Sequence, residues 1–372
     1  MRTMAVIGTG LIGTSVALAA AAQGVSVYLS DRDRTAARTA AALGAGRAQE
    51  PPEPVDLAVL AVPPSQVAAV LIACQGRGLA RAYTDVASVK AGPERAVLGR
   101  APDPAAYVGG HPLAGRERSG PLAARAELFR GRPWALTPHP LTSRAALDRG
   151  LELAELCGAA PVVMRSREHD EVVALTSHVP HLLAAVMAAR LRDGPAGVPL
   201  LAGQGLRDVT RIAAGDPRLW SDILRSNARA MAGVVQELRA DLSRVAAALD
   251  VLAEADDGAR DQGVRTLEEL LARGVAGLAR LPRPGAGPPE GRAALRVLVP
   301  DRPGELARLL GAVAAFGVAA DDIAVEAAEE SGLSVRIPVP TADAERIEAG
   351  LDAVGYAVQV RSPANWTALS KR

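Results

Sequence analysis

The sequence has little lysine, little cysteine and almost no net charge, and each scarcity excludes a class of protein. Lysine occurs only at positions 90 and 371, so arginine carries nearly all the positive charge. The formal net charge of +1 leaves no strongly basic field, and we therefore expect no nucleic-acid partner. With 372 residues and 49% apolar content, the chain is long enough for two or three domains with proper cores.

The two cysteines, Cys74 and Cys157, have neither the spacing of metal ligands nor the density of a disulfide scaffold. Both stand in apolar surroundings, which predicts buried thiols in a reducing compartment. The apolar run from Val16 to Ala22 is too short to span a membrane, and the glycine motif before it explains it better than a signal sequence does. We expect a cytoplasmic protein with no membrane partner and no metal.

The first informative stretch combines a short apolar run from Met4 to Ile7 with the glycines of a G-x-G-x-x-G motif. The glycines are Gly8, Gly10 and Gly13, and Leu11 and Ile12 lie between the last two. In such a turn the first glycine allows the tight bend, the second lets the backbone approach a pyrophosphate, and the third lets helix and strand pack closely. The following helix start offers free N–H groups to phosphates. The alternative is a helix-capping glycine turn without a ligand.

A second apolar run, Val25 to Leu29, is followed by Asp31. A carboxylate at the end of this strand accepts hydrogen bonds from ribose hydroxyls and repels a 2′-phosphate. The motif therefore predicts a dinucleotide site that prefers NAD to NADP. Arg32 and Arg34 weaken the preference, because they could neutralise a phosphate.

The pattern up to residue 166 predicts a Rossmann-type doubly wound α/β sheet. Almost continuous apolar runs are typical of strands buried on both faces. The further strands are expected at Val55–Val62, Ala82–Val86, Ala106–Gly109, Pro133–Thr137 and Pro161–Met164, and helices at Arg34–Leu43 and Arg144–Leu156. Ligands bind beyond the carboxyl ends of such strands, where we expect Ser88 and His111, each just past a strand end.

Three further regions follow the sheet. Residues 167–281 show apolar spacings of three and four and predict an all-helical domain. We expect its apolar excess to form the core of a helix bundle and, by extension, a subunit interface. Residues 282–292 form a proline- and glycine-rich linker. Residues 293–365 predict the order β-α-β-β-α-β of a ferredoxin-like unit.

Three motifs in this order closely resemble those of prephenate dehydrogenases. They are His111 to Gly120 (HPLAGRERSG), Ser177 to His181 (SHVPH) and Gly205 to Ala213 (GLRDVTRIA). The resemblance covers roughly residues 3–280. The tail resembles an ACT domain through Asp301 to Leu306 (DRPGEL), and ACT domains bind small ligands, mostly amino acids.

The resemblance implies a nicotinamide enzyme that removes hydride from the carbinol carbon of prephenate while a base takes the hydroxyl proton. Loss of the ring carboxylate then yields an aromatic ring. It implies that His111 is the base, which an imidazole of ordinary pKa near 6.5 suits. It implies that Ser88 contacts the substrate hydroxyl and nicotinamide, and that Arg211 holds a substrate carboxylate through its planar fork.

Other residues fall at family positions around the expected pocket. His181 matches a position near the substrate side chain, whereas His178 is interpreted as structural. Four more line or gate the pocket in the family: Glu117, Asp170, Arg207 and Trp220. His139 and His169 match no motif and are interpreted as structural or exposed.

The resemblance leaves three matters open. The substrate could be arogenate instead of prephenate, and His181 favours the keto acid although Glu117 and Asp170 could receive an ammonium group. A non-catalytic NAD-responsive sensor is a rival from another class. For the tail we expect tyrosine as effector, with phenylalanine or tryptophan as further candidates, bound by Asp301, Arg302 and Gly304 in the loop before a helix. The alternative is a purely oligomerising domain. We expect a homodimer.

Overall fold

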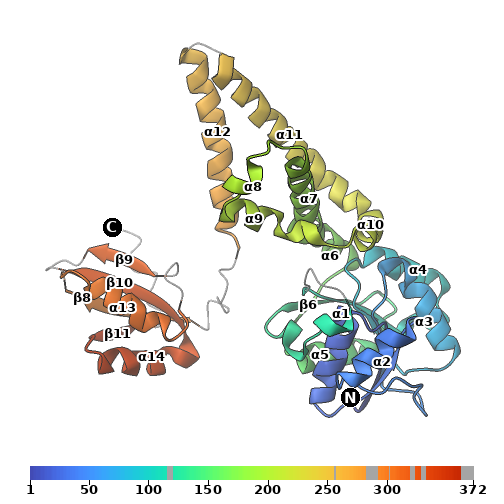
Figure 1. The fold of residues 1–372 in the computed structure, drawn as a ribbon. Coiled ribbons are helices and arrows are strands. Elements are labelled where there is room, and N and C mark those ends of the chain that lie inside the picture. Colours follow the sequence, from blue (N-terminus) through green and yellow to red (C-terminus); the bar gives the residue numbers. More distant parts are fainter. Residues whose placement is uncertain are drawn as a thin grey trace. The chain divides into compact units, whose positions relative to one another are not determined.

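The computed structural model describes residues 1–114, 120–254, 257–281, 292–300, 302–318, 323–327 and 332–361. It divides into two compact units, residues 1–247 and residues 248–372, which are described separately (Figure 1). The predicted linker at 282–292 lies outside the described residues except for Arg292, which starts a strand.

The first unit is built on a seven-stranded sheet of order β2-β1-β3-β4-β5-β6-β7. Its strands are β1 (Thr3–Ile7), β2 (Ser26–Ser30), β3 (Leu57–Leu60), β4 (Tyr83–Asp85), β5 (Tyr107–Pro112), β6 (Pro133–Thr137) and β7 (Ala160–Val163). All neighbours pair in parallel except β5 and β6, which are antiparallel. The alternation of strands and helices predicted the layers of this sheet but not the reversed pair.

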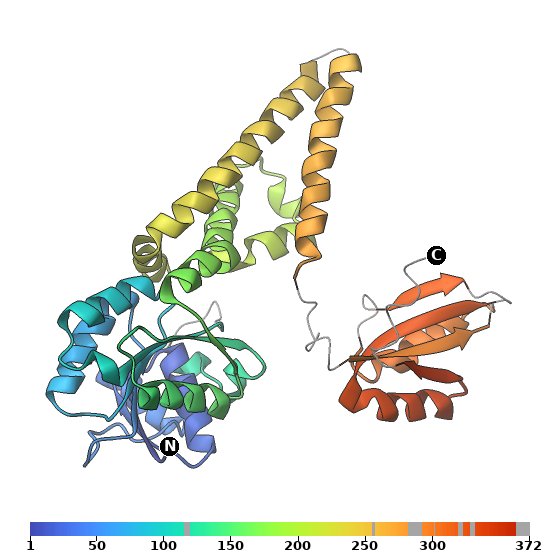
Figure 2. The same ribbon diagram turned by 180° about the vertical axis from the view of Figure 1, so that it is seen from behind.

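Helices cover both faces of the sheet, and Figure 2 shows them from behind. They are α1 (Leu11–Ala22), α2 (Arg34–Ala42), α3 (Val67–Gly76), α4 (Ala91–Arg100) and α5 (Arg144–Leu156). The sequence predicted α2 to within one residue and α5 to its observed bounds, whereas α3 and α4 were not predicted. Single 3-10 turns lie at Pro64–Gln66, Pro104–Ala106, Pro121–Ala123 and Ala126–Phe129.

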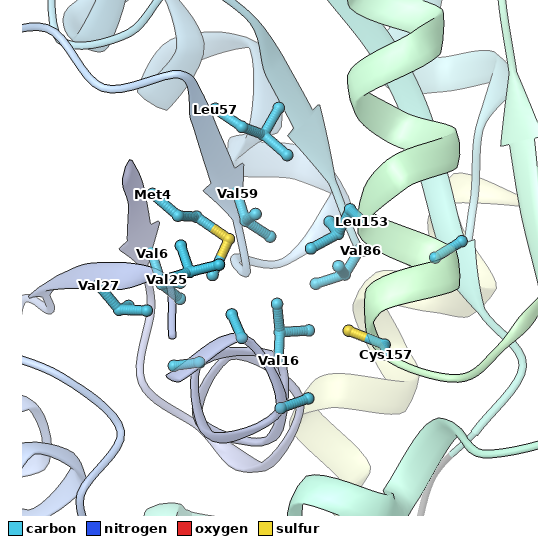
Figure 3. Packing of buried hydrophobic residues seen from close by; sticks show 14 of the residues in the cluster. Met4, Val6, Val16, Val25, Val27, Leu57, Val59, Val86, Leu153 and Cys157 are labelled. Carbon is cyan, nitrogen blue, oxygen red and sulfur yellow. The ribbon is translucent and has the colours of Figure 1, made fainter. Parts of the chain in front are cut away.

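The core on one face of the sheet is packed around α1. Val16 is fully buried and points at side chains of the central strands, among them Met4 and Val59 (Figure 3). Leu153 and Cys157 close the cluster from α5 and the residue after it. A second cluster fills the other face and includes the fully buried Leu71 of α3. Burial of apolar surface on both faces explains why the central strands are almost continuously apolar.

The strand order reverses at β1. From β1 the chain goes to β2 on one side and then to β3 on the other. In open α/β sheets the ligand crevice lies outside the carboxyl ends of the strands at such a switch point. Gly8, Ala61 and the residues after β4 all lie at this edge.

A helical segment follows β7 and confirms the predicted change to helices. It contains α6 (Ser166–Val173), a π-turn (Ala174–His178), α7 (Val179–Arg192), α8 (Val198–Leu201), α9 (Gln204–Thr210), a 3-10 turn (Arg211–Ala214), α10 (Pro217–Ser226) and α11 (Ala228–Glu254). Within the first unit α6 packs on α4, and α10 packs on the turn at Pro64–Gln66.

One stretch of this segment, Ser166–Arg192, is long and apolar enough to cross a membrane by length and composition alone. Core helices of water-soluble proteins pass the same test. This stretch carries His169, Asp170, His178 and His181, all of them buried within the first unit. Such a set of buried polar groups is typical of a helix that packs inside a protein site.

The second unit contains α12 (Asp257–Leu278) and a small α/β module with a four-stranded antiparallel sheet. The module is formed by β8 (Arg292–Val299), α13 (Glu305–Ala314), β9 (Ala324–Ala327), β10 (Leu333–Pro340), α14 (Thr341–Ala353) and β11 (Val358–Arg361). The sheet order is β11-β8-β10-β9. Alternate residues of β10, including Val335 and Ile337, are buried against the two helices.

Candidate active site

Two of the three glycines in the turn after β1, Gly8 and Gly13, have no room for a side chain. Gly8 has φ +100°, and a Cβ placed on it would lie 2.2 Å from the carbonyl oxygen of Ala61. A Cβ on Gly13 would lie 1.9 Å from the carbonyl oxygen of Gly8. The first and third glycines of the motif therefore lock α1 against the ends of β1 and β3.

Gly10 differs from both, because a Cβ on it would meet no atom within 4 Å. It is the N-cap of α1 and makes no side-chain cap hydrogen bond, so no capping side chain takes up the N–H groups of the first turn. An open helix N-terminus on a backbone without a side chain fits the pyrophosphate of a dinucleotide.

Asp31 lies directly after β2, and its carboxylate is held by the glycine turn. One oxygen accepts hydrogen bonds from the backbone N–H of Thr9 at 2.6 Å and from its hydroxyl at 2.9 Å. The other accepts from the backbone N–H of Asp33 at 2.8 Å. The carboxylate is therefore fixed beside the turn, where the motif predicts contact with the adenosine ribose.

His111 lies inside β5, not just beyond the strand end as the sequence suggested. The strand extends to Pro112 because it gains an antiparallel partner, and His111 pairs with Ala135 of β6. The two preceding glycines are packed tightly: a Cβ on Gly110 would lie 2.6 Å from the carbonyl oxygen of Asp85. The strand that carries His111 is therefore pressed against the end of β4.

His111 begins a chain of hydrogen bonds that leads into α6. Its Nδ1 lies 2.8 Å from Nε2 of His169, and Nδ1 of His169 lies 2.9 Å from a carboxylate oxygen of Asp170. His169 is 1% exposed. Of the two expectations for this residue, structural or exposed, its burial fits the first, but the sequence did not identify it as a direct partner of the candidate base.

The surroundings of His111 favour its neutral form. Burial lowers the pKa of His111 well below 6.5, and the neighbouring His169, Lys90 and His178 lower it further. A neutral imidazole can accept a proton, as a general base must.

A buried ion pair lies beneath this strand. The ammonium group of Lys90 pairs with Asp85 and also donates to the carbonyl oxygen of Gly110, while the hydroxyl of Tyr107 donates to Asp85. Burial lowers the pKa of Lys90 and raises the pKa of Tyr107 well above 10. The ion pair joins the end of β4 to the backbone next to His111.

Two more histidines face the same region from the π-turn and α7. The amide of Asn227 donates to Nδ1 of His178 at 3.1 Å and to the carbonyl oxygen of Asp170. This amide orientation puts the proton of neutral His178 on Nε2, which is buried and has no protein partner among the described residues. Burial lowers the pKa of His178 to about 4.

His181 stacks on the indole of Trp220, with ring centroids 3.4 Å apart and an interplanar angle of 9°. His178 meets the same indole edge-on. A Cβ on Gly215 would lie 2.3 Å from the indole nitrogen of Trp220, so only glycine fits beside the pair. Burial lowers the pKa of His181.

For most of the remaining predicted site residues the structure gives the element and the exposure. Ser88 is partly buried in the loop between β4 and α4. Arg211 starts the 3-10 turn that packs on α7, which carries His181, and Arg207 is exposed on α9. Glu117 lies outside the described residues. Asp170 is buried, as a partner of His169.

Other residues singled out in the sequence lie away from this region. His139 is 5% exposed and bonds the carbonyl oxygen of Pro104, which fits a structural role. Cys74 and Cys157 are free and buried. Among the described residues, no group of three or more His, Cys, Asp or Glu side chains is arranged to hold a metal ion.

The loop expected to bind an effector is described only in part. Gly304 has φ +90° and is the N-cap of α13, and the N–H of Arg302 donates to the carbonyl oxygen of Pro300 at 2.8 Å. Asp301 lies outside the described residues.

Comparison with known proteins gives consistent matches over the first two thirds of the chain. Residues 16–163 match the family model described as "Prephenate dehydrogenase, nucleotide-binding domain". Residues 165–269 match the one described as "Prephenate dehydrogenase, dimerization domain".

Individual relatives extend the match. The chain is 44% identical over 350 residues to "Probable prephenate dehydrogenase NovF" of Streptomyces niveus, covering 93% of this chain and 96% of the relative. It is 34% identical to the cyclohexadienyl dehydrogenase of Zymomonas mobilis, covering 67% of this chain and 88% of that protein.

Among solved structures, the fold is similar to that of the prephenate dehydrogenase from A. aeolicus in complex with hydroxyphenyl propionate and NAD+. The TM-score is 0.63 at 24% identity, and the match covers 74% of this chain and 98% of that one.

Proposed function

The chain belongs to the prephenate dehydrogenase family of NAD-dependent oxidoreductases, and on that premise we propose that it oxidises and decarboxylates prephenate to 4-hydroxyphenylpyruvate for tyrosine synthesis. The observation that carries the proposal is the hydrogen-bonded His111 at the carboxyl edge of the sheet, with its pKa held well below 6.5. A base in that state and place is what the oxidation of a hydroxyl group requires.

NAD fits the turn after β1. Gly8 and Gly13 close the turn, Gly10 leaves room for the pyrophosphate at the start of α1, and Asp31 would bind the ribose. We assign Leu11 and Ile12 to the same turn as backbone donors. When bound, NAD supplies the acceptor for the hydride.

The protein's own residues then handle the proton and the carboxylates. His111 takes the hydroxyl proton as the carbinol carbon becomes a ketone, and Ser88 orients that hydroxyl. Decarboxylation makes the ring aromatic and its oxygen a phenolate, to which His111 returns the proton. Arg211 holds a substrate carboxylate by a charge-assisted bidentate contact, and Arg207 adds positive charge nearby.

His181 and Glu117 are assigned to the far side of the substrate. The stacking of His181 on Trp220 presents a neutral ring edge to the pyruvyl group. A neutral ring suits a keto acid better than the ammonium group of arogenate. The alternative substrate is arogenate, which would give tyrosine directly.

The rest of the architecture follows the family. We propose a nucleotide-binding domain at 1–166, a helical substrate and dimerisation domain at 167–281, and a homodimer formed through the latter. Large apolar side chains exposed on its helices support a subunit interface: Val186, Leu242, Leu249, Leu271 and Val275. The enzyme is proposed to be cytoplasmic.

Residues 293–365 are proposed to be an ACT domain that binds tyrosine as feedback inhibitor. The support is the order of the module's strands and helices and the glycine-capped start of α13 beside Arg302. Allosteric control of this kind requires that tyrosine bind two states of the enzyme with different affinity.

The direct test is an assay of the purified full chain with prephenate and NAD, following NADH at 340 nm and 4-hydroxyphenylpyruvate by chromatography. Parallel reactions with arogenate and with NADP give the preferences. Higher kcat/KM with arogenate would replace the proposed substrate, and higher kcat/KM with NADP would mean that Arg32 and Arg34 outweigh Asp31. Absence of turnover with either substrate, together with measurable NAD binding, would favour the sensor.

A further inference from the structure

We propose that His169 and Asp170 are positioning residues that fix the tautomer of His111, so that Nε2 of His111 is the atom that receives the substrate proton. This inference rests on the proposed function, because it specifies how the base of that reaction is set.

The chain of hydrogen bonds is anchored at Asp170. Its two carboxylate oxygens accept from the backbone N–H of Lys90 at 2.8 Å and of Ala91 at 2.9 Å, at the start of α4. The same carboxylate receives Nδ1 of His169. A carboxylate that accepts three N–H groups is an acceptor only, so it requires the proton of His169 to be on Nδ1.

The position of the proton on His169 in turn determines the position of the proton on His111. With Nδ1 of neutral His169 protonated, its Nε2 carries a lone pair. That lone pair lies 2.8 Å from Nδ1 of His111, which must therefore donate. Neutral His111 is then protonated on Nδ1 and bare on Nε2. Protonation of both imidazoles on Nδ1 is the one choice of tautomers that satisfies the His111–His169 and His169–Asp170 hydrogen bonds with both rings neutral.

The hydrogen bonds from His111 through His169 to Asp170 join two parts of the first unit. His111 belongs to β5 and Asp170 to α6, and the N–H groups that hold Asp170 belong to Lys90 and α4. Lys90 also fixes the backbone before His111 through the carbonyl oxygen of Gly110. Besides His169, the charged or titratable groups that act on His111 are Lys90 and His178.

With His111 in this tautomer, every proton and electron pair of the reaction can be followed. The hydroxyl proton moves to Nε2 of His111, and the C–H electron pair leaves as hydride. The imidazolium formed donates through Nδ1 to His169, which in turn donates to Asp170, so the positive charge is linked through His169 to a buried carboxylate. Nε2 returns its proton to the phenolate oxygen once the electron pair of the broken C–C bond has entered the ring.

The test compares His169→Leu, which removes the acceptor, with His169→Gln, whose amide oxygen can still accept from His111. His169→Leu should lower kcat by about 10²-fold or more, as wrong-tautomer variants of catalytic histidines do, with little change in the KM for NAD. His169→Gln should recover most of the loss. A kcat and pH profile of His169→Leu equal to wild type would overturn the proposal.

A second measurement needs no substrate and no turnover. In ¹⁵N NMR of the free wild-type enzyme, His111 should be protonated on Nδ1, and in His169→Leu it should become a mixture of tautomers. Protonation of His111 on Nε2 in the wild type would refute the assignment. Because this reading is independent of prephenate, failure of the proposed function and failure of the inference are distinguishable. Unchanged thermal unfolding of His169→Gln checks that the fold is intact.

Discussion

His111 shows how the setting of a residue supplies what its type alone cannot. A histidine at a strand end is ordinary, but this one is in a buried cluster with two further histidines and a lysine near it. Burial and those neighbours favour the uncharged ring. The same burial makes a donated proton costly to keep unless the imidazolium is paired, which the link through His169 to Asp170 provides.

We predict that His111→Asn lowers kcat by about 10²–10⁴-fold, the usual contribution of general base catalysis. Asparagine keeps a polar side chain of similar size but cannot take a proton. NAD affinity, measured by fluorescence titration, should change little, because His111 does not belong to the glycine turn. Turnover near the wild-type level would exclude His111 as the base.

The pH dependence should follow from the neutral ring. Because the pKa of His111 lies well below 6.5, the base is deprotonated at neutral pH, and kcat/KM should fall only as the pH drops through a value below 6.5. An acid limb centred at or above pH 6.5 in the initial rates would contradict this reading.

For Arg211 we predict loss of substrate affinity. Removal of a charge-assisted bidentate contact costs about 1.5–3 kcal/mol, so Arg211→Ala should raise the KM for prephenate roughly 10-fold or more, since each 1.4 kcal/mol is a decade. Arg225→Ala removes an equal charge from an exposed position on α10 and is the matched control. A KM that rises for NAD and stays constant for prephenate would refute the assignment.

At the scale of elements, the turn between β1 and α1 contains one glycine needed for packing and another that leaves room for a ligand. Gly13 has no room for a methyl group, whereas Gly10 faces open space in the protein and has an extended backbone with φ −71°. The structure therefore supports the different roles that the motif predicts for these two glycines: Gly13 is required for packing, and Gly10 leaves room for a ligand.

The prediction is a contrast between two substitutions. Gly13→Ala should lower the thermal unfolding temperature and abolish NAD binding, because the methyl group would lie 1.9 Å from the carbonyl oxygen of Gly8. Gly10→Ala should keep the unfolding temperature and weaken NAD binding alone, because the methyl group would take the place of the pyrophosphate. Equal NAD affinity in Gly10→Ala and wild type, by calorimetry, would remove the pyrophosphate from this turn.

The strands and helices that the sequence predicted well are those with local signals. Apolar runs next to glycine or proline located several of the seven strands, among them β1, β2 and β3. The side chain of Ser143 caps α5, so the start of this helix has a local signal in the sequence. α3 (VAAVLIACQG) is apolar nearly all round, so it has no amphipathic period to detect. The antiparallel β5–β6 pair depends on partners 22 or more residues apart in the chain, such as Pro112 and Trp134.

The site was predictable as far as motifs name single residues. The partners of those residues were not, because His169 meets His111 across 58 positions and Asn227 meets His178 across 49. The one local signal was the adjacent pair His169-Asp170, in which a carboxylate can fix an imidazole. It gains meaning only once the fold brings β5 beside α6.

For the whole molecule, regulation is expected to reside in the second unit. The module at 292–361 has its own apolar core, which includes Leu295 and Leu309, so a chain ending near residue 285 keeps the elements of the candidate site. We predict that this truncated enzyme remains active and loses inhibition by tyrosine, measured as the tyrosine concentration that halves the rate. Equal inhibition of the truncated and full-length enzymes would place tyrosine at the active site as a product-like competitor.

Chemical labelling of Lys90 can report how often the structure around the candidate site opens. Its side chain is 1% exposed, and the sequence has lysine at only one other position, 371. An amine-directed reagent can therefore reach Lys90 only when β4, β5 and the start of α4 separate and release the ammonium group from Asp85. The labelling rate of that one peptide is a measure of the free energy of local opening at the site. Because lysine is so scarce, local opening of the site can be measured in the unmodified protein, without an introduced probe.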